Sequence, residues 1–151
     1  MIALLQRVSR ASVSVAGREL ASIGQGLMVL VGVERGDAAA QAVRLAERLV
    51  AYRVFADADG RMNLDVKAVG GELLLVPQFT LAADTRRGNR PSFMPAEGAR
   101  QGETLFVAFE QAVRARYPRV VKGEFGADMQ VCLCNDGPVT FWLQVPPDGA
   151  P

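Results

Sequence analysis

The chain has 151 residues, of which 50% are hydrophobic and 22% are charged, a composition typical of a globular domain rather than of a disordered segment. Lys and Arg number 17 against 16 for Asp and Glu, so the net charge does not indicate a nucleic-acid partner. Any RNA binding requires a local patch of positive charge. The sequence contains no histidine, which excludes a Ser-His-Asp triad, a Cys-His pair, a His-based zinc site and an imidazole base.

The length predicts a single domain that buries roughly 70% of its unfolded surface and needs no metal or disulfide to do so. The first apolar run, Met1–Leu5, stops at Gln6 and Arg7. This run is much shorter than the roughly 20 residues that span a bilayer, and too short for a signal segment. We therefore expect a cytoplasmic protein.

The N-terminal third predicts short strands over residues 2–8, 11–15 and 19–23, in a hairpin-like arrangement. The continuous apolar run 27–33 predicts a central strand that is buried on both faces. Asp37 is the expected N-cap of a helix that follows it. The apolar stripe of this helix consists of Ala42, Leu45, Ala46, Leu49, Val50 and Tyr52.

A second apolar strand is expected over residues 72–76, with Pro77 directly after its carboxyl end. Residues 82–95 have no clear period and predict a long loop, which in a compact domain is often functional. A second helix is expected to begin at Pro95 and to stop before Pro118.

Three strands are expected to close the chain, over residues 120–125, 129–134 and 139–145, with Asn-Asp-Gly-Pro as the turn between the last two. Residues 1–145 thus predict one layered α/β domain with a mixed sheet, and residues 146–151 predict a flexible tail. Cys132 and Cys134 alternate along a strand, so they share a face and do not easily bridge each other. We expect them to be buried, reduced thiols, because zinc would need two further ligands.

The segment Gln78-Phe79-Thr80 follows an apolar strand, where backbone N–H groups no longer serve the sheet and are free to face a ligand. Thr80 is a nucleophile only if a base takes its proton, and its alternative role is to satisfy a turn. An oxyanion hole made of two adjacent N–H groups is the more economical hypothesis.

Gly137-Pro138 stands where a tight hairpin turn is expected, yet proline removes a ladder donor there. A cis peptide would resolve the conflict, but X-Pro bonds are cis in only about 5–6% of cases, so the residues alone favour a trans proline at a sheet edge.

The sequence leaves two possible roles for each of two further sites, a trio of arginines and a single arginine. Arg86, Arg87 and Arg90 form either a phosphate clamp or a solvated loop. Arg7 is either a surface residue or a donor that pins another loop through its carbonyls.

From Met1 to Val145 the chain closely resembles the D-aminoacyl-tRNA deacylases. The matching segments, in order, are Gln6–Val8, Arg10–Val13, Gly26–Leu27, Met62–Leu64, Gly70–Gly71, Gln78–Thr85, Arg90–Phe93, Phe125–Met129 and Asn135–Phe141. The resemblance implies a compact, barrel-like mixed or antiparallel sheet covered by two main helices, in a homodimer whose active sites lie at the interface. It also implies that no cofactor or metal takes part.

The reaction implied by the resemblance is hydrolysis of the ester between a D-amino acid and the terminal adenosine of tRNA. In the family the Gly-Pro bond is cis, and two carbonyls of this motif enter the neighbouring subunit's pocket, bind the α-amino group and exclude an L side chain. This assigns substrate binding to Gly137 and Pro138, with Arg7 and Met129 at matching positions around them. Glycine lacks a side chain, so glycyl-tRNA mischarged on alanine tRNA is an expected second substrate.

The resemblance further implies that the ribose 2′-hydroxyl assists the chemistry, while the backbone at Gln78, Phe79 and Thr80 stabilises the oxyanion. One departure is Pro77, where the family usually has serine. A related subgroup also has proline there, but it has alanine in place of Phe79 and tolerates certain L-aminoacyl-tRNAs; it is one alternative. The other alternative is a non-catalytic tRNA-binding module that uses the arginine loop alone.

Overall fold

The computed structural model describes residues 1–149 of the chain. Its elements, in order, are β1 (Ile2–Val15), β2 (Arg18–Ile23), β3 (Gly26–Gly32), α1 (Ala39–Val50), β4 (Phe55–Ala56), β5 (Met62–Leu64), β6 (Glu72–Pro77), the 3-10 turn η1 (Phe79–Ala82), α2 (Ala99–Arg116), β7 (Val120–Lys122) and β8 (Gln130–Gln144). The end of the expected flexible tail, residues 150 and 151, lies outside the described residues. Before it, Asp148 accepts a hydrogen bond from the Gln41 side chain at 3.2 Å.

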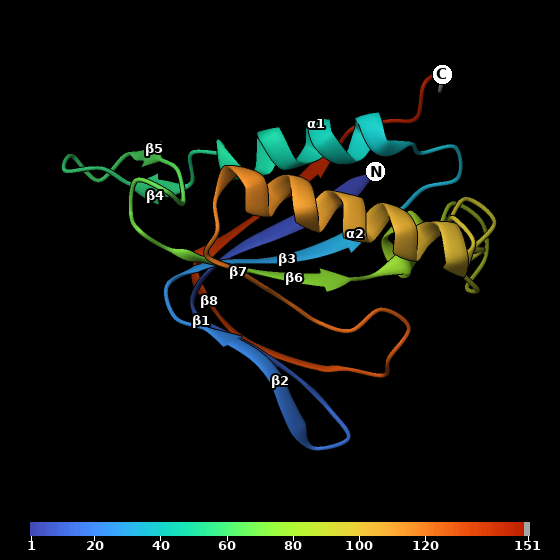
Figure 1. The fold of residues 1–151 in the computed structure, drawn as a ribbon, viewed down its shortest axis with the longest axis horizontal. Coiled ribbons are helices and arrows are strands. Elements are labelled where there is room, and N and C mark those ends of the chain that lie inside the picture. Colours follow the sequence, from blue (N-terminus) through green and yellow to red (C-terminus); the bar gives the residue numbers. More distant parts are fainter. Residues whose placement is uncertain (150–151) are drawn as a thin grey trace.

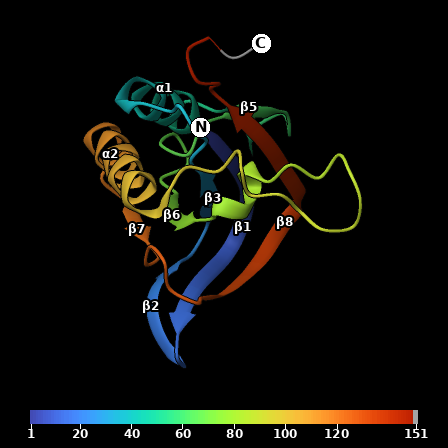
Figure 2. The same ribbon diagram turned by 90° about the vertical axis from the view of Figure 1, so that its right-hand side faces the viewer.

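Six strands form one mixed sheet in the order β2-β1-β3-β6-β7, with β8 paired to β1. β1 is antiparallel to β2, β3 and β8, whereas β6 is parallel to both β3 and β7. The two helices lie side by side over one face of the sheet (Figure 1), and the sheet curls into a nearly closed, barrel-like layer (Figure 2). The expected α/β class, with a mixed sheet under two helices, is confirmed.

Alternation along β3 and β6 divides their apolar side chains between two cores. The side chains that pack toward the helices are those of Leu27, Val29, Val31, Leu73 and Leu75. Those that pack inside the curl of the sheet are Met28, Leu74 and Val76. Both faces of these central strands are therefore buried, as their uninterrupted apolar sequences predict.

β1 is one strand of 14 residues and not the two short strands expected. Its first half pairs with β3 and its second half with β2, while β8 runs along nearly its whole length. A strand that changes its partner midway bends the sheet, and this bend produces the curl.

Asp37 does not cap α1, because the N-cap residue is Ala38. The Asp37 carboxylate instead accepts hydrogen bonds from the Met1 amino group and from the Glu34 N–H, each at 2.7 Å. Burial raises the pKa of this carboxyl, and the two donors partly offset the effect. Asp37, which local rules assign to the N-cap of α1, thus forms a long-range ion pair with the N-terminus instead.

The second helix begins at Ala99, four residues after the expected start at Pro95. β7 ends at Lys122, and residues 130–144 form the single strand β8 instead of two. Cys132 and Cys134 are exposed on β8 and not buried, since the apolar positions of this strand, not the thiols, face the core. Neither α1 nor α2, nor any other helix within residues 1–149, combines the length and apolarity needed to cross a membrane.

Candidate active site

The carboxyl end of β6 is where the chain leaves the sheet. Pro77 pairs with Val31 in the parallel β3–β6 ladder, and the Gln78 N–H makes one more bond to the Val31 carbonyl at 2.7 Å. The chain then turns into η1. Gln78, Phe79 and Thr80 therefore lie at the edge of the sheet, as the sequence predicts.

Two adjacent backbone donors at this edge have no protein partner. The first residues of a helical turn lack an intrahelical acceptor, and within residues 1–149 the N–H groups of Phe79 and Thr80 donate no hydrogen bond. The Thr80 hydroxyl accepts a bond of 2.6 Å from the Gln78 side-chain amide. Two adjacent free N–H groups are the kind of donor from which an oxyanion hole is built.

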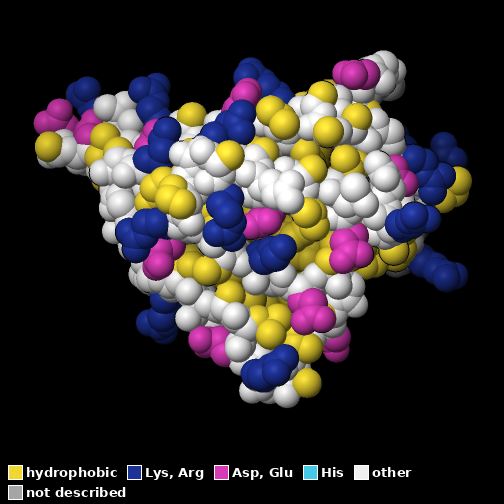
Figure 3. Space-filling view, in the orientation of Figure 1, with side chains coloured by type: hydrophobic (Ala, Val, Ile, Leu, Met, Phe, Trp, Pro, Cys, Tyr) yellow, Lys and Arg dark blue, Asp and Glu magenta, His cyan; other side chains and the backbone are white. Residues whose placement is uncertain are grey.

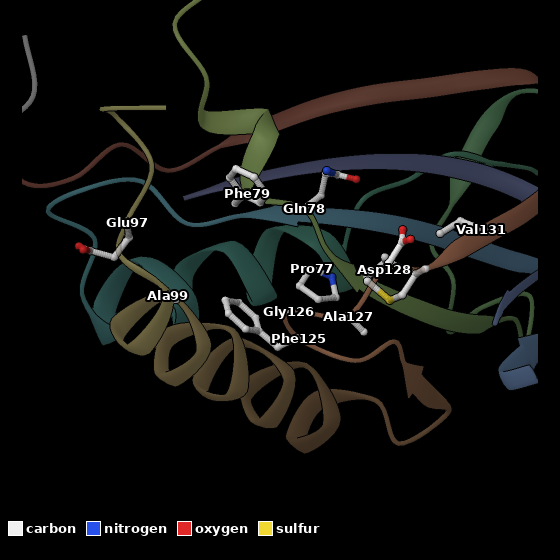
Figure 4. A pocket seen from close by; sticks show the side chains of 12 residues that line it. Pro77, Gln78, Phe79, Glu97, Ala99, Phe125, Gly126, Ala127, Asp128 and Val131 are labelled. Atoms are coloured by element: carbon white, nitrogen blue, oxygen red, sulfur yellow. The ribbon is translucent and has the colours of Figure 1, made fainter. Parts of the chain in front are cut away.

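A cavity of about 520 Å³ is lined by Phe79, the first of these two residues, and Thr80 follows it just outside the lining. Figure 4 shows Pro77, Gln78 and Phe79 on one side of it and Phe125 on the other. Its remaining lining comes from Val76, Glu97, Ala99, Gly126, Ala127, Asp128, Met129 and Val131. Its size suits one small organic group.

The charges of the cavity are all negative. Among the described residues its lining includes the carboxylates of Glu97 and Asp128 and no Lys or Arg. Apolar walls and acidic acceptors favour a flat ring, a hydroxyl or an ammonium group, and they disfavour a phosphate. Any phosphate of a ligand must therefore lie outside this cavity.

Met129 is one of the walls of this cavity, so the structure brings it together with Gln78 and Phe79. Its sulfur accepts a hydrogen bond from the Glu124 N–H at 3.4 Å. A Cβ atom at Gly123 would come within 2.8 Å of the same sulfur. The close approach of the Gly123 backbone therefore helps to hold the Met129 side chain in place.

The Asn-Asp-Gly-Pro segment is a bulge within β8 and not the hairpin turn that its residues predict. Thr140 pairs with Gln6 and Asn135 pairs with Val8, so residues 136–139 face only Arg7 of β1. We call residues 136–139 the Gly-Pro bulge. The Gly137–Pro138 peptide bond is cis, which corrects the trans geometry favoured by the residues alone and agrees with what the family resemblance implies.

Two side chains hold the Gly-Pro bulge in place. Asn135 bridges it, because its amide donates to the Val139 carbonyl at 3.1 Å and accepts from the Val139 N–H at 2.9 Å. Arg7 donates to the Asp136 carbonyl at 3.0 Å and to the Val54 carbonyl at 2.7 Å. Arg7 is therefore the pin that the sequence left as one of two possibilities.

Gly137 has a φ of +137°, in the region that favours glycine. A Cβ atom there would lie 2.6 Å from a Val139 methyl group and 3.2 Å from the Arg7 guanidinium. Asp136, Gly137 and Pro138 are all exposed. The bulge is thus a rigid, exposed stretch of main chain with no side chain at its centre.

The Gly-Pro bulge does not reach the cavity of its own chain. Arg7 pairs with Leu27, whereas Pro77 pairs with Val31, and three strand spacings separate β8 from β6. Measured along the sheet, at about 3.3 Å per residue and about 4.8 Å per strand, this offset amounts to roughly 20 Å. The curl of the sheet brings Val131 of β8 to the cavity, but none of residues 136–139 lines it. The predicted substrate-binding pair Gly137 and Pro138 is therefore separate from Gln78, Phe79 and Thr80 within one chain.

Residues 84–94, which we call the arginine loop, lie beside the cavity, since Phe93 contacts the cavity residue Phe79. Its ends are joined by two backbone hydrogen bonds between Asp84 and Ser92, at 2.8 and 3.0 Å. Arg86 forms a two-pronged ion pair with Asp84, at 2.9 and 2.8 Å, and holds the pKa of that carboxyl far below its usual range. Arg87 and Arg90 make no ion pair within residues 1–149, so they are the free cations of the predicted trio.

Figure 3 shows Lys and Arg side chains grouped at the right-hand edge of the molecule, where this loop projects in Figure 1. The same loop carries Phe93, whose ring centroid lies 5.1 Å from that of Phe79. Sequence reasoning assigned no role to Phe93, nor to the cavity residues Glu97, Phe125 and Asp128. The signals available were the segments Arg90–Phe93 and Phe125–Met129, which no local pattern connects to Gln78; for Glu97 there was none.

Comparison with known proteins identifies the relatives of this chain. The family model described as D-Tyr-tRNA(Tyr) deacylase matches residues 4–144. A D-aminoacyl-tRNA deacylase of Dichelobacter nodosus is 59% identical over 145 residues, which cover 96% of this chain and 100% of the relative. A protein of the same name from Nitrosococcus oceani is 60% identical over 147 residues, which cover 97% of this chain and 95% of that one.

Two solved structures share the fold. One is titled c-Myc DNA Unwinding Element Binding Protein; it has a TM-score of 0.92 and 38% identity, and the match covers 97% of this chain and 99% of the other. The second is titled as a probable eukaryotic D-amino acid tRNA deacylase, with a TM-score of 0.83 and coverage of 95% and 98%. At 17% identity this second match supports the fold alone.

Proposed function

The chain belongs to the D-Tyr-tRNA(Tyr) deacylase family, and from this premise we propose that it hydrolyses the ester of D-aminoacyl-tRNA to free D-amino acid and tRNA. The observation that carries the proposal is the pair of N–H groups at Phe79 and Thr80 that have no partner within residues 1–149, the first of them on a residue that lines the cavity. Relatives named D-aminoacyl-tRNA deacylase, with 59% and 60% identity, support the substrate class.

The two N–H groups stabilise the reaction by binding the ester oxygen as it becomes negative. When a nucleophile adds to the carbonyl carbon, the charge moves to this oxygen, and two fixed donors then bind it more strongly than in the ground state. No histidine exists to activate an attacking group. The 2′-hydroxyl of the terminal ribose lies next to the 3′ ester and supplies the assistance that the protein lacks, while the protein orients the two.

The cavity takes the terminal nucleoside with its aminoacyl group. The rings of Phe79 and Phe125 and the Pro77 side chain offer apolar surface to a base or to an amino-acid side chain. The carboxylates of Glu97 and Asp128 add acceptors without repelling the uncharged nucleoside. The phosphates stay outside, where Arg87 and Arg90 are free to bind them.

A second copy of the chain completes each site. The Gly-Pro bulge is exposed and pinned by Arg7 and Asn135, and none of its residues lines the cavity of its own chain. A homodimer allows the bulge of one copy to enter the cavity of the other. There its main-chain carbonyls bind the substrate's α-amino group.

The selection of D over L follows from this arrangement. An L-aminoacyl group, anchored by its amino group and its ester, would direct its side chain into the bulge, and a pinned main chain cannot move aside. A D side chain points away from it. Glycine has no side chain to exclude, so glycyl-tRNA mischarged on alanine tRNA is also a substrate.

Hydrolysis of matched D- and L-tyrosyl-tRNA by the purified protein tests the proposal. We expect release of D-tyrosine with L-tyrosyl-tRNA left intact. Comparable release of both enantiomers would favour the L-tolerant subgroup, against which Phe79 argues. Failure to release either, with tRNA binding retained, would favour a non-catalytic binding module.

A further inference from the structure

Two large apolar side chains are exposed on the arginine loop, next to the cavity. Phe93 is 43% exposed and Met94 is 74% exposed. Exposed neighbours of this size lose the stabilisation that burial provides, and such pairs often mark a binding surface. Neither residue lines the cavity, so the function proposed above does not account for them.

The backbone that carries these two side chains is hydrogen-bonded on both sides of them. Before them, Ser92 pairs with Asp84 through two hydrogen bonds. After them, the Pro95 carbonyl accepts from the Arg35 N–H at 2.8 Å, and the Ala96 N–H donates to the Phe93 carbonyl at 3.0 Å. A surface that is already ordered loses little entropy when a ligand binds to it.

The apolar surface continues from the cavity to the loop. The ring of Phe79 lines the cavity, and its centroid lies 5.1 Å from that of Phe93 with an interplanar angle of 59°. A ligand that fills the cavity and extends outward past Phe79 therefore meets Phe93 next.

The charges change sign along the same path. The cavity contains Glu97 and Asp128 with no cation, whereas Arg87 and Arg90 on the loop are exposed and unpaired within residues 1–149. This order matches a nucleoside inside the cavity, followed by a phosphate and a second base. Aromatic surfaces interleaved with arginines are the usual means of binding single-stranded nucleic acid.

We infer that Phe93, with Met94 beside it, stacks on the base that precedes the terminal adenosine of the tRNA, and that Arg87 and Arg90 bind the adjoining phosphates. This inference rests on the proposed function, because it extends the same substrate by one nucleotide. The alternative occupant is a second copy of the chain that covers Phe93, and the test below separates the two.

The test compares two minimal substrates, the 3′-D-tyrosyl esters of adenosine and of the dinucleotide cytidylyl-adenosine. We expect the wild-type protein to have the higher kcat/KM on the dinucleotide. Phe93→Ala should lower kcat/KM on the dinucleotide at least fivefold, since loss of one aromatic–base stack has about this effect or more. On the adenosine ester the change should stay within twofold.

Two variants serve as controls. Phe93→Trp keeps a flat ring and should retain the advantage of the dinucleotide. Met62→Ala removes another exposed apolar side chain, 51% exposed on β5, and should alter neither substrate. Equal losses on both esters, or no loss, would overturn the inference, because Phe93 would then act only through Phe79 or not at all. A Phe93→Ala protein that sediments as a smaller species would assign Phe93 to the subunit interface instead.

Binding of the trinucleotide CCA without an amino acid attached tests the stacking of Phe93 even if no ester is hydrolysed. The proposed function fails if wild-type protein leaves D-tyrosyl-tRNA intact, whereas the stacking inference fails if Phe93→Ala binds CCA as tightly as the wild type does. Arg87→Gln and Arg90→Gln should each reduce the salt dependence of log K for CCA by about 0.7. An unchanged slope in both variants would remove the phosphate contacts from the inference.

Discussion

The end of β6 and the Gly-Pro bulge both interrupt the sheet, but they differ in whether their backbone groups have hydrogen-bond partners. At the end of β6 the chain leaves the sheet and two N–H groups lack a partner within residues 1–149. In the bulge the chain remains in β8, and the side chains of Arg7 and Asn135 bind its backbone on either side of Gly137. The first region has free donors, which the proposed reaction uses, and the second has the rigidity that the proposed exclusion of L-aminoacyl groups requires.

The largest effect should follow from removing a donor at the end of β6. Thr80→Pro deletes one N–H of the proposed oxyanion hole, so we expect kcat for D-tyrosyl-tRNA to fall roughly 10²–10³-fold. Thr80→Ala keeps the N–H and loses only the hydroxyl that accepts from Gln78. It should retain most of the activity.

Thermal unfolding of both Thr80 variants checks that the fold is intact. If Thr80→Ala were as inactive as Thr80→Pro while unfolding at the wild-type temperature, the hydroxyl would be the catalytic group. The end of β6 would then act through a side chain and not through its free backbone N–H groups.

The substrate offers the next largest effect. A D-tyrosyl-tRNA whose terminal ribose lacks the 2′-hydroxyl should react roughly 10²-fold more slowly, since general acid–base assistance contributes about 10²–10⁴. It should bind as well as the normal substrate, because the N–H groups and the cavity are unchanged. Single-turnover hydrolysis at saturating protein measures the chemical step. A normal rate would return the search to a side chain, with Thr80 first.

The rigidity of the bulge is tested by Gly137→Ala. The added methyl group would meet the Val139 side chain and the Arg7 guanidinium at a positive φ, so we expect a loss of about 2–3 kcal/mol in the free energy of unfolding. Activity on D-tyrosyl-tRNA should fall at least tenfold, because in the proposed homodimer the displaced bulge would no longer fit the neighbouring cavity.

Gly60→Ala is the matched control. Gly60 also has a positive φ, of +77°, but no atom lies within 4 Å of its added Cβ. It should cost about 1 kcal/mol of backbone strain and leave activity unchanged. Urea unfolding and hydrolysis assays compare the two variants. If they behaved alike, strain rather than contact with Arg7 would explain the effect, and the bulge would not be a pinned element.

The two regions also differ in how far the sequence predicts them. The end of β6 follows from local information, because the apolar run 72–76 predicts the strand and its end predicts the free donors. The bulge depends on Arg7 and Asn135, whose contact joins positions 128 residues apart. Local rules therefore predicted a hairpin turn there.

The other errors have similar causes. Alternation showed that Cys132 and Cys134 share a face but not which face, since this depends on how β8 registers against β1. Asp37 has the residue type of a cap, but the buried Met1 amino group binds it instead. The cavity wall at Phe125 and Asp128 meets β6 only after the chain has passed through α2, so no local pattern connects them.

The smallest effect should come from Pro77→Ser, which restores the residue usual in the family. The Gln78 N–H points to β3, and successive N–H groups along a strand alternate in direction, so the N–H missing at position 77 would point to the β7 side. On that side the Gly123 N–H still donates to the Leu75 carbonyl at 2.9 Å. The proline therefore forgoes at most one hydrogen bond, to the Gly123 carbonyl at the end of the sheet.

We accordingly expect Pro77→Ser to change kcat/KM for D-tyrosyl-tRNA by less than about threefold, which corresponds to less than about 0.7 kcal/mol. The donors at Phe79 and Thr80 remain in place, and serine is smaller than proline at the cavity wall. Parallel assays with L-tyrosyl-tRNA are essential here. A change in the hydrolysis of L-tyrosyl-tRNA by this variant would show that the end of β6, and not the Gly-Pro bulge alone, sets the preference for the D enantiomer. The assignment of reaction to the end of β6 and of exclusion to the bulge would then be wrong.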